Sequence, residues 1–118
     1  MIVKTIKTNK IIHNDRNIYS VLDEHLKIFK EKSILVITSK IISICEGRVV
    51  EVAKADKKEL IKREAEYYLP PEESKYNITL TIKNNLLIPT AGIDESNGNG
   101  YYVLWPSNPQ KTANEIRE

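Results

Sequence analysis

The sequence contains little cysteine, glycine and phenylalanine, and it has no long apolar run. Its one cysteine, Cys45, cannot form an internal disulfide, so we expect a reducing, cytoplasmic setting. No apolar segment approaches the roughly 20 residues of a membrane-spanning helix, and Met1–Lys4 does not begin a signal peptide. The two histidines and the cysteine lack the spacing of a zinc site. The scarcity of these residues argues against a disulfide-stabilised protein, a membrane protein and a zinc-binding protein.

The residues that are present have an ordinary globular balance, with 41% hydrophobic and 29% charged among 118 residues. This length suits a single domain, 1–118, with a modest core. Lysine and glutamate are mixed along the chain, as on a solvated surface. The net charge of +2 is too small to predict nucleic acid as a partner.

Hydrophobic periodicity predicts an α+β fold, with a mixed β-sheet packed against about four helices. Strands are expected over residues 2–12, 34–38, 49–52, 78–82, 86–88 and 101–106. Helices are expected over residues 17–30, 40–46, 56–69 and from 108 to the end. The run Ile34–Thr38 gives the strongest strand signal, because it is rich in β-branched residues and suggests burial on both faces. Asn84–Asn85 predicts a hairpin turn before the strand at 86–88.

Polar residues just before the apolar periodic stretches predict where the helices begin. Asn14 or Asp15 is expected to cap the first helix, and Ser39 the second. Asp56 is expected to cap the third helix in a capping box. Asn108, followed by proline, is expected to cap the fourth.

An acidic and amide cluster, Asp94–Asn97, follows an apolar run and the small residues Ala91 and Gly92. We expect this cluster on a loop at the mouth of a buried strand, where active-site groups are often placed. Its oxygen atoms form a surface suited to Mg²⁺ or Mn²⁺. Ala91 and Gly92 would let a ligand or another backbone approach closely. A polar loop built for turn formation alone is the interpretation that the local residues favour.

A second candidate site is the junction at Ser39 and Lys40, where a predicted strand leads directly into a helix. Backbone N–H groups and the helix dipole favour a phosphate there, and Lys40 would add a positive charge. The glycines of a Walker sequence are missing, so capping by Ser39 is the simpler interpretation. Cys45 is expected to be a buried, inert thiol.

Several segments together resemble the N-terminal half of the coenzyme F-420-0:gamma-glutamyl ligase family. They are residues 38–43 (TSKIIS), 46–48 (EGR), 91–97 (AGIDESN), 104–109 (LWPSNP) and 113–117 (ANEIR). The resemblance covers essentially the whole chain, and the Gly-Ile-Asp-x-Ser-Asn element is its most specific part. Trp105 and the form of residues 41–47 are most similar to bacterial relatives described as gamma-glutamate ligases of folate metabolism.

The resemblance implies a ligase that uses a nucleotide and divalent metal ions. In the F-420 enzymes of that family GTP phosphorylates a substrate carboxylate, and for this chain GTP and ATP both stay open. The amine of L-glutamate then attacks the acyl phosphate and forms a gamma-linked amide. Two metal ions, Mg²⁺ or Mn²⁺, neutralise the phosphates. The resemblance also implies a homodimer, and the acceptor is expected to be an F-420 precursor or a folate-like carboxylate.

By the same resemblance, Asp94 is a metal ligand. The nucleotide-binding residues are Ser39, Lys40 and Asn97. Glu95 and Ser96 are expected to contact the metal ligand and hold it in place without binding the metal themselves. No residue is assigned as a catalytic acid, base or nucleophile.

Three departures from the family pattern qualify this expectation. Ile44 stands where the family carries a lysine, so a phosphate contact is lost or the nucleotide preference is altered. Thr8–Ile11 replaces the opening nucleotide loop. The second metal-binding aspartate of the family falls beyond Glu118, so we expect the N-terminal part of a longer ligase that is inactive alone. The alternative is a non-catalytic binding or interaction module on the same scaffold.

Overall fold

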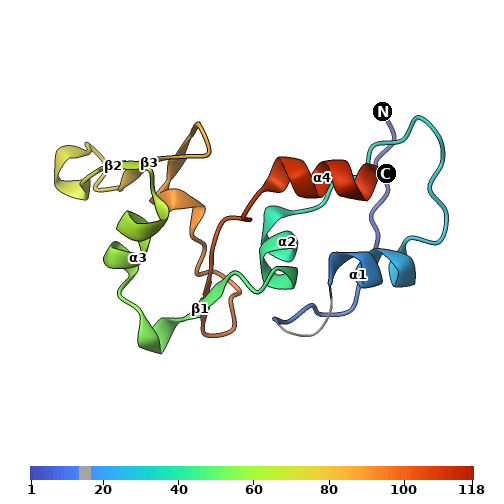
Figure 1. The fold of residues 1–118 in the computed structure, drawn as a ribbon, viewed down its shortest axis with the longest axis horizontal. Helices are drawn as coiled ribbons and strands as arrows, with labels where there is room; N and C mark the ends of the chain where they lie inside the picture. The colour runs from blue at the N-terminus through green and yellow to red at the C-terminus, as the bar shows by residue number, and fades with distance from the viewer. Residues whose placement is uncertain (14–16) are drawn as a thin grey trace. The chain divides into compact units, whose positions relative to one another are not determined.

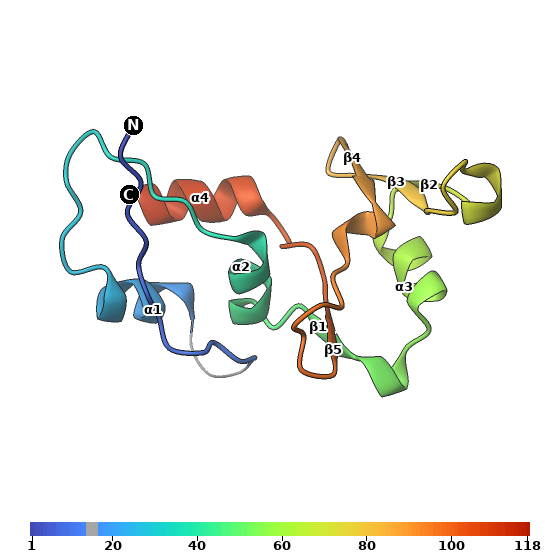
Figure 2. The ribbon, with the colours of Figure 1, turned by 180° about the vertical axis from the view of Figure 1, so that it is seen from behind.

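The computed structural model describes residues 1–13 and 17–118, which form two compact units. The first unit comprises residues 1–48 and 106–118, and the second comprises residues 49–105. The elements of each unit are labelled in Figures 1 and 2. In the described part of the chain there are four α-helices and two small antiparallel sheets, which confirms the α+β class. The assignment of 1–118 to a single domain of a longer ligase stays a prediction.

The first unit contains three helices: α1 (Ile18–His25), α2 (Ser39–Cys45) and α4 (Pro109–Arg117). Asn17 caps α1, and the cap predicted at Asn14 or Asp15 falls outside the described residues. Helix α1 ends at His25 instead of running to residue 30. Ile28 and Phe29 beyond that point are exposed, and a helix gains most of its stability from a buried face. Asn108 caps α4 as predicted, accepting a hydrogen bond from the backbone N–H of Lys111 at 2.9 Å.

Two strands predicted in this unit are wrong. Residues 2–12 and 34–38 have no strand structure, and Ile34 and Val36 are 88% and 85% exposed instead of buried on both faces. A strand needs a hydrogen-bonded neighbour, and among the described residues neither segment has one. Ser39 is the first residue of α2 and not its cap, because Thr38 takes the N-cap position. Gly47 ends that helix region with a φ of +70°, a left-handed conformation that glycine adopts without steric cost.

The second unit contains helix α3 (Lys57–Glu64), a two-stranded sheet and a three-stranded sheet. The strands are β1 (Val49–Glu51), β2 (Tyr67–Leu69), β3 (Leu80–Lys83), β4 (Leu86–Pro89) and β5 (Tyr101–Val103). Strand β1 pairs with β5, and the larger sheet has the order β2-β3-β4. Asp56 caps α3 as predicted, since its side chain accepts a hydrogen bond from the backbone N–H of Glu59. The predicted extension of α3 to residue 69 is wrong, because residues 67–69 pair with β3 instead.

The hairpin between β3 and β4 confirms the turn predicted at Asn84–Asn85, whose φ angles are +50° and +60°. The alternation of isoleucine and leucine with threonine over residues 78–82 predicts that the apolar side of β3 is buried, and this prediction is wrong. The buried side chain of β3 is Thr81, whereas Ile82 is exposed. The Thr81 hydroxyl donates to the carbonyl of Ile88 and accepts from the backbone N–H of Ala91, so its polar atom is satisfied in the interior.

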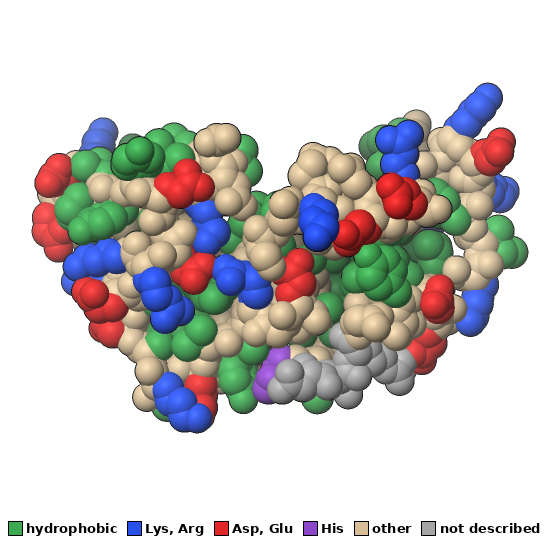
Figure 3. All heavy atoms as spheres, viewed as in Figure 1, with side chains coloured by type: hydrophobic (Ala, Val, Ile, Leu, Met, Phe, Trp, Pro, Cys, Tyr) green, Lys and Arg blue, Asp and Glu red, His purple; other side chains and the backbone are tan. Residues whose placement is uncertain are grey.

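The core of the second unit lies where α3, the 3₁₀ turn Thr90–Gly92 and the end of β5 meet. Its buried members are Leu60, Ile61, Ala91, Ile93, Tyr102 and Leu104. The face seen in Figure 3 shows acidic and basic side chains interspersed, as the mixing of lysine and glutamate along the chain predicts. Since Ile93 belongs to this core, the core fixes the point at which the Asp94 loop begins.

Candidate functional site

Asp94 is anchored through its backbone to β5. Its N–H donates to the carbonyl of Val103 at 2.9 Å, and its carbonyl accepts from the N–H of Val103 at 2.7 Å. Ile93 on one side of this bridge and Val103 across it are both buried. The Asp94 side chain therefore leaves the chain from a fixed position on the rigid part of the unit.

The Asp94 carboxylate is oriented by its own loop. Its Oδ1 accepts hydrogen bonds from both the backbone N–H and the hydroxyl of Ser96, each at 2.8 Å. This arrangement is an Asx turn, in which an aspartate side chain replaces a backbone acceptor. Ser96 thus contacts Asp94 directly, and its role in supporting a metal ligand stays a prediction.

Glu95 is held by a residue that the sequence does not indicate. Lys57, the first residue of α3, places its Nζ 2.8 Å from Glu95 Oε2. The same ammonium lies 5.8 Å from the ring centroid of Tyr102. An exposed ion pair of this kind stabilises by roughly 0–1 kcal/mol, so its effect is to direct Glu95 toward α3. Lys57 is 38 positions away from Glu95, and no local pattern could reveal the pair.

The end of the loop is shaped by turns. Asn97 is exposed and has a φ of +59°, a left-handed conformation that asparagine tolerates well. The N–H of Gly98 bonds the carbonyl of Glu95, and the carbonyl of Gly98 accepts from Tyr101. A side chain at Gly98 would collide with the carbonyl of Tyr101, 2.0 Å from an added Cβ. Turn geometry therefore accounts for the residue types at the end of the loop, and the nucleotide contact of Asn97 stays a prediction.

The small residues before Asp94 allow close packing within the second unit. Gly92 has a φ of +71°, and a Cβ added there would lie 2.6 Å from Cε3 of Trp105. Ala91 is fully buried in the core. The close approach predicted at Gly92 is thus made by a tryptophan ring, not by a ligand or another backbone.

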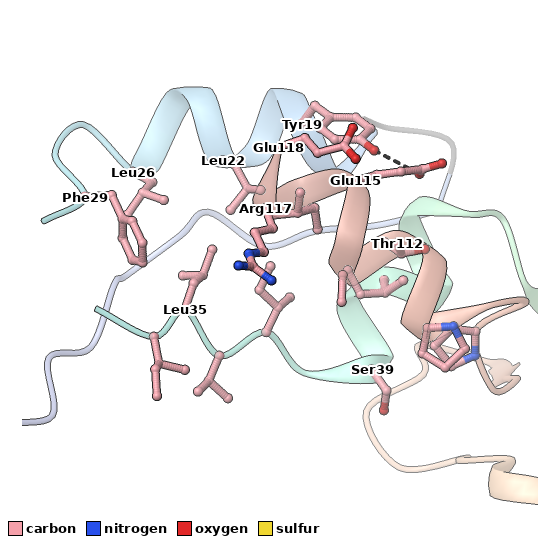
Figure 4. A pocket seen from close by; sticks show the side chains of 18 of the residues that line it. Tyr19, Leu22, Leu26, Phe29, Leu35, Ser39, Thr112, Glu115, Arg117 and Glu118 are labelled. Atoms are coloured by element: carbon pink, nitrogen blue, oxygen red, sulfur yellow. Dashed lines mark hydrogen bonds between the residues drawn. The ribbon is translucent and has the colours of Figure 1, made fainter. Parts of the chain in front are cut away.

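Ser39 and Lys40 lie in the first unit, both half-buried in the first turn of α2. Ser39 borders a hollow of about 930 Å³ in that unit, whose walls come from α1, α4 and residues 33–37 (Figure 4). Leu22, Phe29 and Leu35 make much of the wall apolar. At one end the hydroxyl of Tyr19 donates to Glu115 at 3.2 Å, and desolvation together with this carboxylate raises the pKa of Tyr19.

Glu46 joins α2 to α4 within the first unit. Its Oε2 accepts from the backbone N–H of Ser107 at 2.9 Å and from the Ser107 hydroxyl at 2.7 Å. Its Oε1 accepts from the hydroxyl of Thr112 at 3.4 Å. The sequence gives no direct sign of this contact, although Glu46 and Ser107 fall in two of the family-like segments. Glu46 thereby fixes the start of α4 on the end of α2.

The predicted site residues fall into two groups. Asp94, Glu95, Ser96 and Asn97 follow one another on the loop of the second unit, and Ser39 and Lys40 are neighbours in the first. Within residues 1–13 and 17–118, no three His, Cys, Asp or Glu side chains gather into a metal site. Mg²⁺ commonly uses only one or two carboxylates, with water and substrate phosphates completing its shell. A single oriented carboxylate at Asp94 fits that type of binding.

A family model described as F420-0:gamma-glutamyl ligase matches residues 5–118. The chain belongs to this family. The match includes nearly all of both units, so it confirms the resemblance inferred from the separate segments. Comparisons with curated proteins and with solved structures give no match. None of the helices in the described ranges has the length and apolar character needed to cross a membrane.

Proposed function

We propose that the chain is the N-terminal portion of a gamma-glutamyl ligase that depends on a nucleotide and a divalent metal. GTP or ATP transfers its γ-phosphoryl group to an acceptor carboxylate, giving an acyl phosphate and a nucleoside diphosphate. The amine of L-glutamate attacks the acyl carbon, releases inorganic phosphate and forms the amide. The acceptor is an F-420 precursor or a folate-like carboxylate. The family match over residues 5–118 is the observation that carries this proposal.

In this proposal the two groups of residues have different roles. Asp94 holds Mg²⁺ or Mn²⁺, which when bound neutralises charge on the phosphates. Ser96 keeps the Asp94 carboxylate oriented, since it donates two hydrogen bonds to one oxygen. Glu95 supports the loop through Lys57. The nucleotide is contacted by Ser39, Lys40 and Asn97.

The cellular setting and assembly belong to the same proposal. The ligase acts in the cytoplasm, where its one cysteine stays reduced. It works as a homodimer, and neither nucleic acid nor a membrane is a partner.

A non-catalytic interaction module is the second candidate. It is favoured by Ile44, a half-buried residue of α2 that stands where the family pattern has a lysine. A module of this kind would bind a partner without turning over a nucleotide.

Calorimetric titration of the protein with GTP or ATP and Mn²⁺ tests the ligase proposal. Asp94→Asn keeps the oxygen that accepts from Ser96 but removes the charge, so the fold is retained and metal-dependent nucleotide binding should fall at least tenfold. The matched variant Glu95→Gln, on the same loop, should bind nearly as well as the unmodified protein. Equal binding by Asp94→Asn and the unmodified protein would reject Asp94 as the metal ligand. Transfer of labelled glutamate to the two acceptor classes, assayed with the full-length protein because this portion is expected to be inactive alone, then separates the ligase from the non-catalytic module.

A further inference from the structure

Lys57 connects helix α3 to the Asp94 loop within the second unit. Its Nζ lies 2.8 Å from Oε2 of Glu95 and 5.8 Å from the ring centroid of Tyr102. Its backbone is held in the first turn of α3, which Asp56 caps. The helix and the start of the loop pack on the same core, so the ammonium group reaches Glu95 from a fixed base.

Glu95 follows Asp94 directly and carries a second carboxylate on a longer side chain. The Asp94 carboxylate is oriented by two hydrogen bonds from Ser96, whereas the Glu95 carboxylate is directed toward α3 by Lys57. The side chains of Lys57 and Glu95 are 40% and 50% exposed. The ion pair, and not enclosure by neighbouring groups, therefore keeps the Glu95 carboxylate in its place.

The direction of this second carboxylate matters for a divalent cation bound at Asp94. Mg²⁺ is small, requires near-octahedral geometry and commonly uses one or two carboxylates together with water and phosphate oxygens. Ca²⁺ takes about six to eight oxygen ligands in a flexible arrangement. A mobile carboxylate that can reach the cation adds oxygen ligands, so it favours Ca²⁺ more than Mg²⁺. Holding Glu95 on α3 removes that advantage.

We propose that Lys57 is a positioning residue that makes the Asp94 site prefer Mg²⁺ to Ca²⁺, because it keeps the Glu95 carboxylate away from the cation. The inference rests on the proposed function, in which Asp94 binds the metal. It adds the residue that sets which cation the site accepts. Lys57 acts through Glu95 and not by contact with the metal or the nucleotide.

Calorimetric titration of the full-length protein with GTP or ATP tests this role, in excess Mg²⁺ and separately in excess Ca²⁺. The readout is the ratio of the two nucleotide dissociation constants. The two cations carry the same charge, so a general change in electrostatic potential affects both constants alike and cancels in the ratio. Lys57→Met should shift the ratio toward Ca²⁺ by roughly tenfold, the size of effect seen when a group that orients metal-binding side chains is removed.

Three variants control for other effects of the substitution. Lys62→Met is the matched control, since Lys62 also lies on α3, pairs with Glu59 at 3.0 Å and lies 6.0 Å from the ring centroid of Tyr68. It should leave the ratio unchanged. Lys57→Arg retains the positive charge and should retain the ratio. In a Glu95→Gln background Lys57→Met should have no effect, because no carboxylate is released. Circular dichroism verifies that each variant is folded.

The outcomes separate this role from the proposed function. An unchanged ratio in Lys57→Met would overturn the role of Lys57, and the metal site would stand if Asp94→Asn still lost metal-dependent binding. An equal shift in Lys62→Met, or a shift that persists with Glu95→Gln, would show that the effect does not pass through Glu95 and would also overturn it. Undiminished binding by Asp94→Asn would reject the metal site, and the role of Lys57 would fail with it.

Discussion

Gly92 and Gly47 have nearly the same backbone conformation in very different surroundings. Their φ angles are +71° and +70°. A Cβ added at Gly92 would lie 2.6 Å and 3.2 Å from two atoms of the Trp105 ring, whereas one added at Gly47 would meet nothing within 4 Å. Replacing each glycine with alanine therefore separates backbone strain from steric collision.

The two substitutions should lower the free energy of unfolding by different amounts. Both place a side chain in the left-handed region, which costs roughly 1–2 kcal/mol. Gly92→Ala also forces the Trp105 ring to move within a packed interior, and overpacking of this kind costs roughly 1–3 kcal/mol more. We expect a loss of about 1–2 kcal/mol for Gly47→Ala and about 2–5 kcal/mol for Gly92→Ala.

Urea unfolding measures this difference directly. Trp105 is the only tryptophan, so its fluorescence follows the second unit, and circular dichroism follows the whole chain. In a Trp105→Leu background, Gly92→Ala should cost little more than Gly47→Ala, because the colliding ring is gone. Equal losses for the two glycine variants in the natural background would refute the close contact between Gly92 and Trp105.

Two further predictions concern the hydroxyl of Thr81 and the thiol of Cys45. Thr81→Val leaves the buried N–H of Ala91 without its acceptor and should lower the free energy of unfolding by roughly 1–3 kcal/mol. Thr81→Ser keeps the hydroxyl and should retain most of the free energy of unfolding. Urea titrations measure both variants. Desolvation, followed by the neighbouring Glu46 carboxylate, raises the pKa of Cys45, so less thiolate exists at neutral pH. Iodoacetamide should therefore modify Cys45 more slowly than free cysteine at pH 7, and its rate should rise at a higher pH. Coincident pH profiles would contradict this.

Local residue patterns predict where helices begin better than they predict which segments pair with one another in the folded chain. The caps at Asp56 and Asn108 and the turn at Asn84–Asn85 are confirmed, because each depends on contacts within a few residues. The strand expected at 34–38 is wrong, since β-branched residues favour an extended chain but supply no neighbouring strand. The helix expected to reach residue 69 ends early for the converse reason, because residues 67–69 have a partner in β3 that lies beyond any local window.

The candidate site likewise has features that the sequence predicts and contacts that it does not. The Asp94 loop and its small preceding residues could be located from the sequence, because turn formers after an apolar run are a local signal. The contact that holds Glu95 in the second unit and the one that holds the start of α4 in the first could not, since Lys57 is 38 residues from Glu95 and Glu46 is 61 residues from Ser107. Both pairs depend on side chains that only the folded chain brings together.

Strand β3 has two sides that differ in burial. On one side Thr81 accepts from the N–H of Ala91, three residues before Asp94, and so positions the entry to the loop. On the other side Ile82 is 39% exposed. The sequence pattern alone would bury the isoleucine side and expose the threonine side. The hydroxyl of Thr81 reverses this, because its bonds to Ala91 and Ile88 satisfy it in the interior.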